Sequence, residues 1–236
     1  MTNHSTASAC TRWARARRLR LALLTAVGAA LLAPSLVSAS TMREPVSGEQ
    51  FEMVRTEGGT RYRCIGVGAH KLFTFKVYAV AYYVDEQQAG ESLGQYARTR
   101  FPDKRGRSLV AALQDDPGFF EMLASLPGEK MMVVRFLRDI PGDRLAGSFR
   151  ESLKKLVPGG DAERVAQAIG ARSVAEGETA LLYSQGADLV MQVGSTQRVL
   201  RGVPLVTERL WRVWLGKGTP TPNLKRSLAT EAARQR

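Results

Sequence analysis

Cysteine and histidine are scarce in this sequence, with two of each among 236 residues. His4 and Cys10 precede a segment that we expect to be removed, which leaves Cys64 and His70. A single cysteine cannot form an internal disulfide, and a single histidine is a poor basis for a zinc site or a Ser-His-Asp triad, which need several convergent groups. The sequence therefore argues against metal catalysis and triad hydrolysis. We expect no metal ion and no cofactor, and we expect Cys64 to be a small buried apolar residue.

Nucleotide-binding motifs and repeats are also lacking. The sequence has no glycine-rich loop of the kind that surrounds a phosphate, no internal repeat and no low-complexity tract. Gly66 and Gly68 form an isolated pair, which favours a bend in the chain over a nucleotide site.

The first 39 residues have the order of a secretory signal peptide. Five arginines (Arg12, Arg15, Arg17, Arg18 and Arg20) precede an apolar run that ends in small residues, and Val37-Ser38-Ala39 fits cleavage after Ala39. We therefore expect residues 1–39 to be a signal peptide, residues 40–236 to be a single domain, and the mature protein to be periplasmic or secreted. The alternative is a retained membrane anchor, although about 17 apolar residues are barely enough to cross a bilayer.

The net charge of +12 falls to +7 without the signal peptide, which holds five arginines and no acidic residue. The remaining basic residues concentrate in residues 98–107 (RTRFPDKRGR) and 224–236 (LKRSLATEAARQR). Neither run has the interleaved aromatic residues of a nucleic-acid reader, and an exported chain rarely meets nucleic acid. We expect solvated surfaces and no nucleic-acid partner, with weak contact to a membrane surface as the alternative.

The order of strand and helix patterns predicts an α+β fold. Strand patterns cover residues 50–56, 61–69, 72–84, 129–140 and three runs between 178 and 203, and helical patterns cover residues 85–97, 105–126, 141–157, 161–171, 204–216 and 222–234. This order is typical of a large, mostly antiparallel sheet covered by a layer of helices.

The longest strand pattern, residues 72–84 (LFTFKVYAVAYYV), has two different faces. Its odd positions are apolar or aromatic (Phe73, Phe75, Val77, Ala79, Ala81 and Tyr83). Its even positions carry polar groups among aliphatic ones (Thr74, Lys76, Tyr78 and Tyr82). Because successive strand side chains point to opposite faces, we expect the odd face to form the core and the even face to border a cleft. The alternative is that the even face is a partly solvated sheet surface.

Three segments resemble the chalcone isomerase family. Residues 66–85 (GVGAHKLFTFKVYAVAYYVD) look like its Gly-x-Gly hairpin and long strand, residues 131–156 like a strand leading into its cleft helix, and residues 210–229 like its closing helix with a Leu-Lys signature. The resemblance spans residues 46 to 230. It implies an open-faced sandwich, in which a cleft between sheet and helices binds flavonoids in the plant enzymes or fatty acids in non-catalytic relatives.

The polar positions of the plant enzymes are only partly kept. By resemblance, the arginine that follows the Gly-x-Gly turn falls on His70, the strand threonine near Tyr78, the helix tyrosine near Leu145, the helix asparagine near Ser152 and the last threonine near Val213. A neutral histidine cannot make the bidentate contact of a guanidinium. The resemblance therefore implies a non-catalytic member with no catalytic residues.

We expect this protein to bind an amphipathic small molecule such as a fatty acid through His70, Thr74, Lys76, Tyr78 and Ser152. One alternative is an isomerase or intramolecular lyase that acts on an enone-like substrate. The other is an interaction scaffold whose cleft is filled by side chains. We expect Trp211 and Trp214, three residues apart, to pack in the core, with ligand stacking as the alternative.

Overall fold

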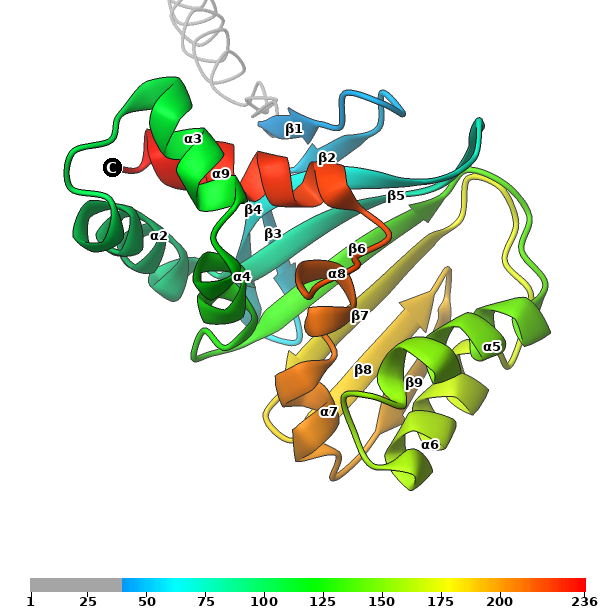
Figure 1. Cartoon of the computed structure of the whole chain (residues 1–236). Coiled ribbons are helices and arrows are strands. Elements are labelled where there is room, and N and C mark those ends of the chain that lie inside the picture. Colours follow the sequence, from blue (N-terminus) through cyan, green and yellow to red (C-terminus); the bar gives the residue numbers. More distant parts are fainter. Residues whose placement is uncertain (1–39) are drawn as a thin grey trace, which may run out of the picture. The chain divides into compact units, whose positions relative to one another are not determined.

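The main sheet has seven strands that follow one another in sequence order (Figure 1). They are β3 (Val54–Glu57), β4 (Thr60–Leu72), β5 (Phe75–Asp85), β6 (Lys130–Phe136), β7 (Thr179–Gln185), β8 (Asp188–Val193) and β9 (Thr196–Leu200). Every neighbouring pair is antiparallel. The computed structural model describes residues 40–236, except for the side chains of residues 89 and 90, so the predicted signal peptide lies outside the described residues.

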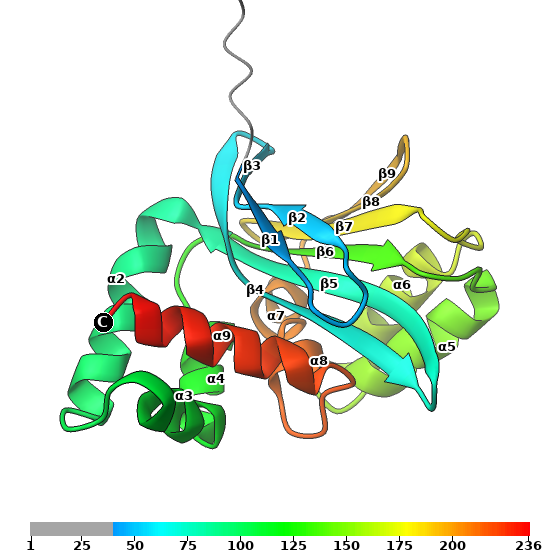
Figure 2. The ribbon, with the colours of Figure 1, turned by 90° about the horizontal axis from the view of Figure 1, so that it is seen from above.

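Helices cover one face of this sheet and a small hairpin covers the other (Figure 2). The helices are α2 (Glu86–Arg100), α3 (Gly106–Gln114), α4 (Pro117–Ala124), α5 (Gly142–Leu153), α6 (Gly159–Ile169), α7 (Pro204–Arg209), α8 (Arg212–Leu215) and α9 (Pro222–Arg234). The hairpin consists of β1 (Thr41–Arg43) and β2 (Gln50–Glu52). The predicted α+β class with a large antiparallel sheet is therefore confirmed.

Two helix starts follow directly from their sequences. Asp85 accepts a hydrogen bond from the backbone N–H of Gln87 at 2.9 Å, and Asp116 accepts one from Gly118 at 2.9 Å, with Pro117 in the first turn. Each aspartate satisfies a backbone donor that has no partner within the helix. Because Asp116 starts a new helix, the pattern at residues 105–126 divides into α3 and α4.

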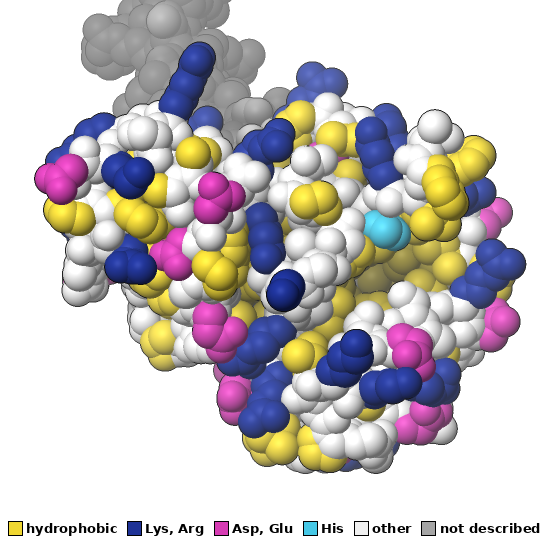
Figure 3. Space-filling view, viewed as in Figure 1, with side chains coloured by type: hydrophobic (Ala, Val, Ile, Leu, Met, Phe, Trp, Pro, Cys, Tyr) yellow, Lys and Arg dark blue, Asp and Glu magenta, His cyan; other side chains and the backbone are white. Residues whose placement is uncertain are grey.

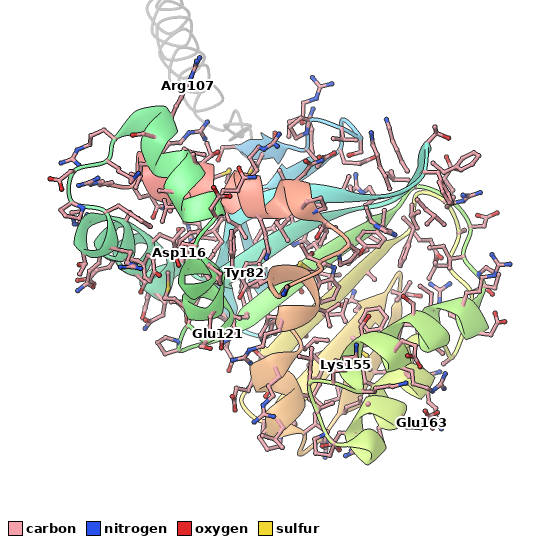
Figure 4. All side chains as sticks on the ribbon, viewed as in Figure 1. Tyr82, Arg107, Asp116, Glu121, Lys155 and Glu163 are labelled. Carbon is pink, nitrogen blue, oxygen red and sulfur yellow. The ribbon has the colours of Figure 1, made fainter. Side chains whose placement is uncertain are left out.

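From Ala79 to Val84, strand β5 is buried on both faces. The core role predicted for the odd positions is therefore confirmed in this part of the strand, whereas the cleft role predicted for Tyr82 is wrong. Ala79, Ala81 and Tyr83 pack in a smaller apolar cluster with Phe51 of the β1–β2 hairpin. The even positions from Val80 to Val84 join the larger cluster under the helices. Tyr82 is fully buried there (Figure 4), and its hydroxyl donates to the carbonyl of Leu123 at 3.1 Å. The helix-covered core is therefore on the even face. Both clusters lie within residues 40–236, which belong to one compact unit.

The first residues of the predicted long strand form a turn instead. β4 continues to Leu72 and pairs with β5 from Phe75, so Phe73 and Thr74 connect the two strands. Phe73 is 90% exposed and Phe75 is 60% exposed, so the prediction that they belong to the core is wrong. Neither turn residue is glycine, asparagine, aspartate or proline, and the sequence therefore lacks the usual turn signal.

The glycine pair allows α9 to approach β4 closely. A Cβ atom at Gly68 would lie 2.5 Å from the backbone nitrogen of Leu224, and one at Gly66 would lie 2.7 Å from the side chain of Leu228. Both glycines lie inside β4, and the pairing of β4 with β5 shifts its register between Cys64 and Gly66, as at a β-bulge. The absence of side chains at these positions brings the closing helix against the sheet, and Leu224 and Leu228 are fully buried.

Candidate ligand-binding cavity

A cavity of about 460 Å³ lies between the sheet and α5. Its floor comes from β6, β7 and β8, and its walls come from α5, the end of α6 and α8. The apolar lining includes Val134, Phe136, Leu145, Phe149, Ile169, Leu182, Met191, Val193, Val213 and Trp214. Figure 3 shows a hollow with hydrophobic side chains on its floor and a histidine at its edge. This size and lining are those of a site for a small, mostly apolar molecule.

One apolar stripe packs helix α5 against the rest of the protein. Leu145, Phe149 and Leu153 recur every four residues, so they lie on one face of the helix. Leu153 is fully buried in the core, whereas Leu145 and Phe149 line the cavity. The ring of Phe149 also meets Trp214 edge to face, with 5.9 Å between the ring centroids. The stripe thus both anchors the helix and gives the cavity an apolar wall.

Tyr78, Trp214 and His70 form the aromatic corner of the cavity. Burial raises the pKa of Tyr78 to about 12, while the nearby indole of Trp214 opposes the rise, so the hydroxyl is neutral at physiological pH. The indole N–H of Trp214 is buried beside this hydroxyl and makes no well-formed hydrogen bond within residues 40–236. The rings of His70 and Tyr78 lie 5.2 Å apart. The corner therefore places a neutral hydroxyl, an indole N–H and an imidazole side by side.

The hydrogen bond of His70 fixes its tautomer when the ring is neutral. Its Nδ1 lies 2.9 Å from the carbonyl oxygen of Pro220. Because a carbonyl oxygen only accepts, Nδ1 carries the proton and Nε2 is left as an acceptor.

Four arginines border the cavity. Arg172 is neutralised by Glu178, to which it donates two hydrogen bonds at 2.7 and 3.1 Å. Arg138, Arg144 and Arg198 are exposed, and none of the three has an ion pair within residues 40–236. The carboxylate of Asp139 accepts a hydrogen bond from the backbone of Glu176 at 2.8 Å. The rim is therefore positively charged.

Three of the five predicted ligand-binding residues line this cavity: His70, Tyr78 and Ser152. Ser152 donates its hydroxyl to the carbonyl of Ser148 one turn earlier at 2.9 Å, so it offers mainly an acceptor. Thr74 and Lys76 do not belong to the lining. Both are exposed at the tip of the β4–β5 hairpin, because the turn occurs where the strand was predicted.

None of the three uncompensated arginines is among the predicted ligand-binding residues. Arg144 lies on the predicted cleft helix, whereas Arg138 follows β6 and Arg198 lies in β9. Only the sheet order brings these separate segments to one rim.

The predicted apolar roles of three residues are confirmed. Cys64 is fully buried, and burial raises the pKa of its thiol to about 12, so it stays protonated. Trp211 is fully buried and donates its indole N–H to the carbonyl of Thr207 at 2.6 Å. Trp214 is also buried, but it packs against the cavity.

A second cavity, of about 530 Å³, lies between the β1–β2 hairpin and α9. Its lining includes several charged residues: Arg43, Glu44, Arg226, Glu231 and Arg234. Its apolar lining is limited to Met42, Pro45, Val46, Met53 and Val67 and includes no aromatic residue, so the first cavity is the better candidate for an apolar ligand.

No cluster of three or more histidine, cysteine, aspartate or glutamate side chains within residues 40–236 could hold a metal ion. None of the helices in this part of the chain has the length and apolar character needed to span a bilayer.

Comparison with known proteins identifies the fold. No family model matches the sequence, and no curated protein matches it. A crystal structure of a fatty-acid binding protein from Arabidopsis thaliana is similar, with a TM-score of 0.59 and 15% sequence identity over 83% of this chain and 98% of the plant chain. The curled antiparallel sheet, the helical layer and this likeness together show that the chain has a chalcone isomerase-like fold.

Proposed function

We propose that this protein is a non-catalytic binder of an amphipathic small molecule such as a fatty acid. The observation that carries the proposal is an apolar cavity with uncompensated arginines at its rim. An acyl chain buried in the cavity gains roughly 0.8 kcal/mol for each methylene group removed from water. A carboxylate at the rim meets Arg138 or Arg144, and a guanidinium is suited to paired contacts with carboxylate oxygens.

The aromatic corner gives such a ligand further polar contacts. The neutral Tyr78 hydroxyl donates a hydrogen bond, and His70 offers an acceptor at Nε2 or, when protonated, a second donor. These groups suit a carboxylic acid or another polar head group, whereas the rest of the lining suits a hydrocarbon chain. The plant protein of similar fold, named as a fatty-acid binding protein, supports this ligand class.

Two observations weigh against the rival functions. The positions that resemble the polar sites of the plant isomerases carry Leu145 and Val213, and both present apolar groups to the cavity. An enzyme that stabilises an enolate needs preorganised donors, and loss of one such donor commonly reduces the rate about a hundredfold or more. The open volume of about 460 Å³ weighs against a scaffold with a filled cleft.

We also retain export as part of the proposal. The basic, apolar and small-residue order of residues 1–39 supports a signal peptide, and the ligand would then be bound in the periplasm or outside the cell.

The test is displacement of a fluorescent fatty acid from residues 40–236 by unlabelled fatty acid. Ser148→Trp places a large side chain on the cavity side of α5, and Glu151→Trp adds the same side chain one turn along at an exposed position outside the lining. We expect Ser148→Trp to abolish binding and Glu151→Trp to retain it, with similar melting temperatures. Binding that survives Ser148→Trp would exclude this cavity as the site.

A further inference from the structure

The tip of the β4–β5 hairpin concentrates exposed hydrophobic side chains. Four large hydrophobic residues of the described chain are exposed, and three of them are here: Leu72 at 56%, Phe73 at 90% and Phe75 at 60%. The hairpin projects beyond the neighbouring strands in both ribbon views (Figures 1 and 2). The tip is therefore a small convex apolar surface without a partner in residues 40–236.

The backbone of this tip is strained at an aromatic residue, Phe73. Phe73 is the one non-glycine residue between positions 40 and 236 with a positive φ, at 55°. Glycine or asparagine relieves such strain, and a bulky residue is unusual there. Strain that is retained at an exposed position, where the side chain contributes nothing to the core, is typical of a functional contact.

Positive charge surrounds the apolar tip. Lys71 and Lys76 lie opposite each other in the strand register, an arrangement of like charges that is unfavourable without an anionic partner. The guanidinium of Arg138 lies over the ring of Phe75, 5.2 Å from its centroid. Residues 70–77 (HKLFTFKV) include no acidic residue. The tip thus combines aromatic rings with cations, and its charge is complementary to an anionic surface.

We propose that this hairpin docks the protein on an anionic lipid bilayer. Leu72, Phe73 and Phe75 enter the interfacial region of the bilayer, and Lys71, Lys76 and Arg138 contact the phosphate groups of the lipids. A lipid surface fits better than a protein partner because a six-residue convex tip offers far less than the roughly 1,000 Å² of a specific protein interface. A bilayer instead accepts individual side chains without a complementary pocket.

The tip also adjoins the cavity. His70, Leu72 and Arg138 all line it, so docking brings its mouth to the lipid surface. This link between docking and ligand uptake rests on the proposed function, whereas docking itself does not require the cavity to hold a ligand.

The test is co-sedimentation of residues 40–236 with vesicles of phosphatidylcholine alone or mixed with phosphatidylglycerol. We expect binding to the mixed vesicles, and weak binding to phosphatidylcholine. Phe73→Asn removes the ring and relieves the backbone strain, so it should reduce the affinity about tenfold or more while the melting temperature stays the same or rises. Val199→Asn, at an exposed strand position elsewhere, is the control and should bind like the unmodified protein.

The charges give a second, independent measurement. The double change Lys71→Gln and Lys76→Gln should reduce the affinity for mixed vesicles by about fivefold per residue and should make it less sensitive to salt. Absence of binding to mixed vesicles, or equal binding by Phe73→Asn and the unmodified protein, would overturn the proposal. Self-association that is lost in Phe73→Asn, without vesicle binding, would identify the tip as a protein contact and would also overturn it.

Failure of docking can be separated from failure of the proposed ligand site. Phe73 lies outside the cavity lining, so Phe73→Asn should bind a fluorescent fatty acid in solution with unchanged affinity. Ser148→Trp should show the reverse pattern, with vesicle binding retained and fatty-acid binding lost. If Phe73→Asn lost fatty-acid binding as well, the tip would be part of the cavity wall and not a separate docking element.

Discussion

Two aromatic residues of strand β5, Phe75 and Tyr82, should differ sharply in their contribution to stability. Phe75 is 60% exposed, so truncation to alanine loses well under half of the roughly 1.5–3 kcal/mol that full burial of such a side chain provides. Its contact with Arg138 adds roughly 0.5–1 kcal/mol at an exposed site. We therefore expect Phe75→Ala to lower the free energy of unfolding by about 1–2 kcal/mol.

Tyr82 has the opposite environment. It is fully buried, its ring lies 6.1 Å from that of Trp211, and its hydroxyl donates to Leu123. Truncation of a buried aromatic residue commonly costs about 3–5 kcal/mol. We expect Tyr82→Ala to reach that range and Tyr82→Phe, which removes only the hydrogen bond, to cost about 1 kcal/mol.

Urea unfolding of residues 40–236 measures these differences directly, because the midpoint and the slope give the free energy of unfolding. Tyr82→Phe keeps the comparison possible if Tyr82→Ala does not fold. Equal losses for Phe75→Ala and Tyr82→Ala would refute the assignment of the hairpin tip as exposed and of the even face as core.

Four further predictions concern packing, pH, activity and export. Gly68→Ala should destabilise the protein by about 1–3 kcal/mol because a Cβ atom at this position would meet the backbone of α9. Gly147→Ala should stabilise it by about 0.5–1 kcal/mol, because Gly147 lies in α5 and a Cβ atom there would have nothing within 4 Å. Urea unfolding measures both changes, and equal effects of the two variants would contradict this reasoning. The pKa of Tyr78 is raised in the folded protein to about 12, so its contribution to the free energy of unfolding is complete below pH 10 and is lost as the pH rises toward 12. Between pH 10 and 12 the unmodified protein should therefore lose more free energy of unfolding than Tyr78→Phe does, when each is compared with its own value at pH 8. Purified protein should show no chalcone cyclisation above the uncatalysed rate, and a rate proportional to protein concentration would support the isomerase alternative. The mature protein should begin near Ser40 in a soluble extracellular or periplasmic fraction, and mass spectrometry that finds residues 1–39 intact in membranes would instead indicate an anchor.

The sequence predicted the fold class because strand and helix periodicities were clear and occurred in an informative order. It misplaced the turn between β4 and β5 because Phe73 and Thr74 have none of the residue preferences of a tight turn. It also missed the burial of the even face of β5 at Val80, Tyr82 and Val84. These side chains join the core under the helices, and such long-range packing leaves no local signal in the strand.

Part of the candidate site could be predicted because it lies on segments that resemble a known family. These segments contain His70, Tyr78 and Ser152, which all line the cavity. Arg138 and Arg198 could not be predicted as rim residues, because the pairing of separate strands, and not proximity in the sequence, brings them to the rim. Thr74 and Lys76 were misplaced together, by the same error in the position of the turn.

Strand β5 should therefore show a gradient of amide hydrogen exchange along a single element. From Ala79 to Val84 the strand is buried on both faces and paired on both sides, so exchange there requires opening of the core. At Phe75 and Lys76 the side chains are exposed and β6 no longer pairs with the strand, so local fraying is enough. The mouth of the cavity lies at this weakly protected end, so we expect local fraying beside it to break only a few hydrogen bonds near the tip while the rest of the sheet stays folded.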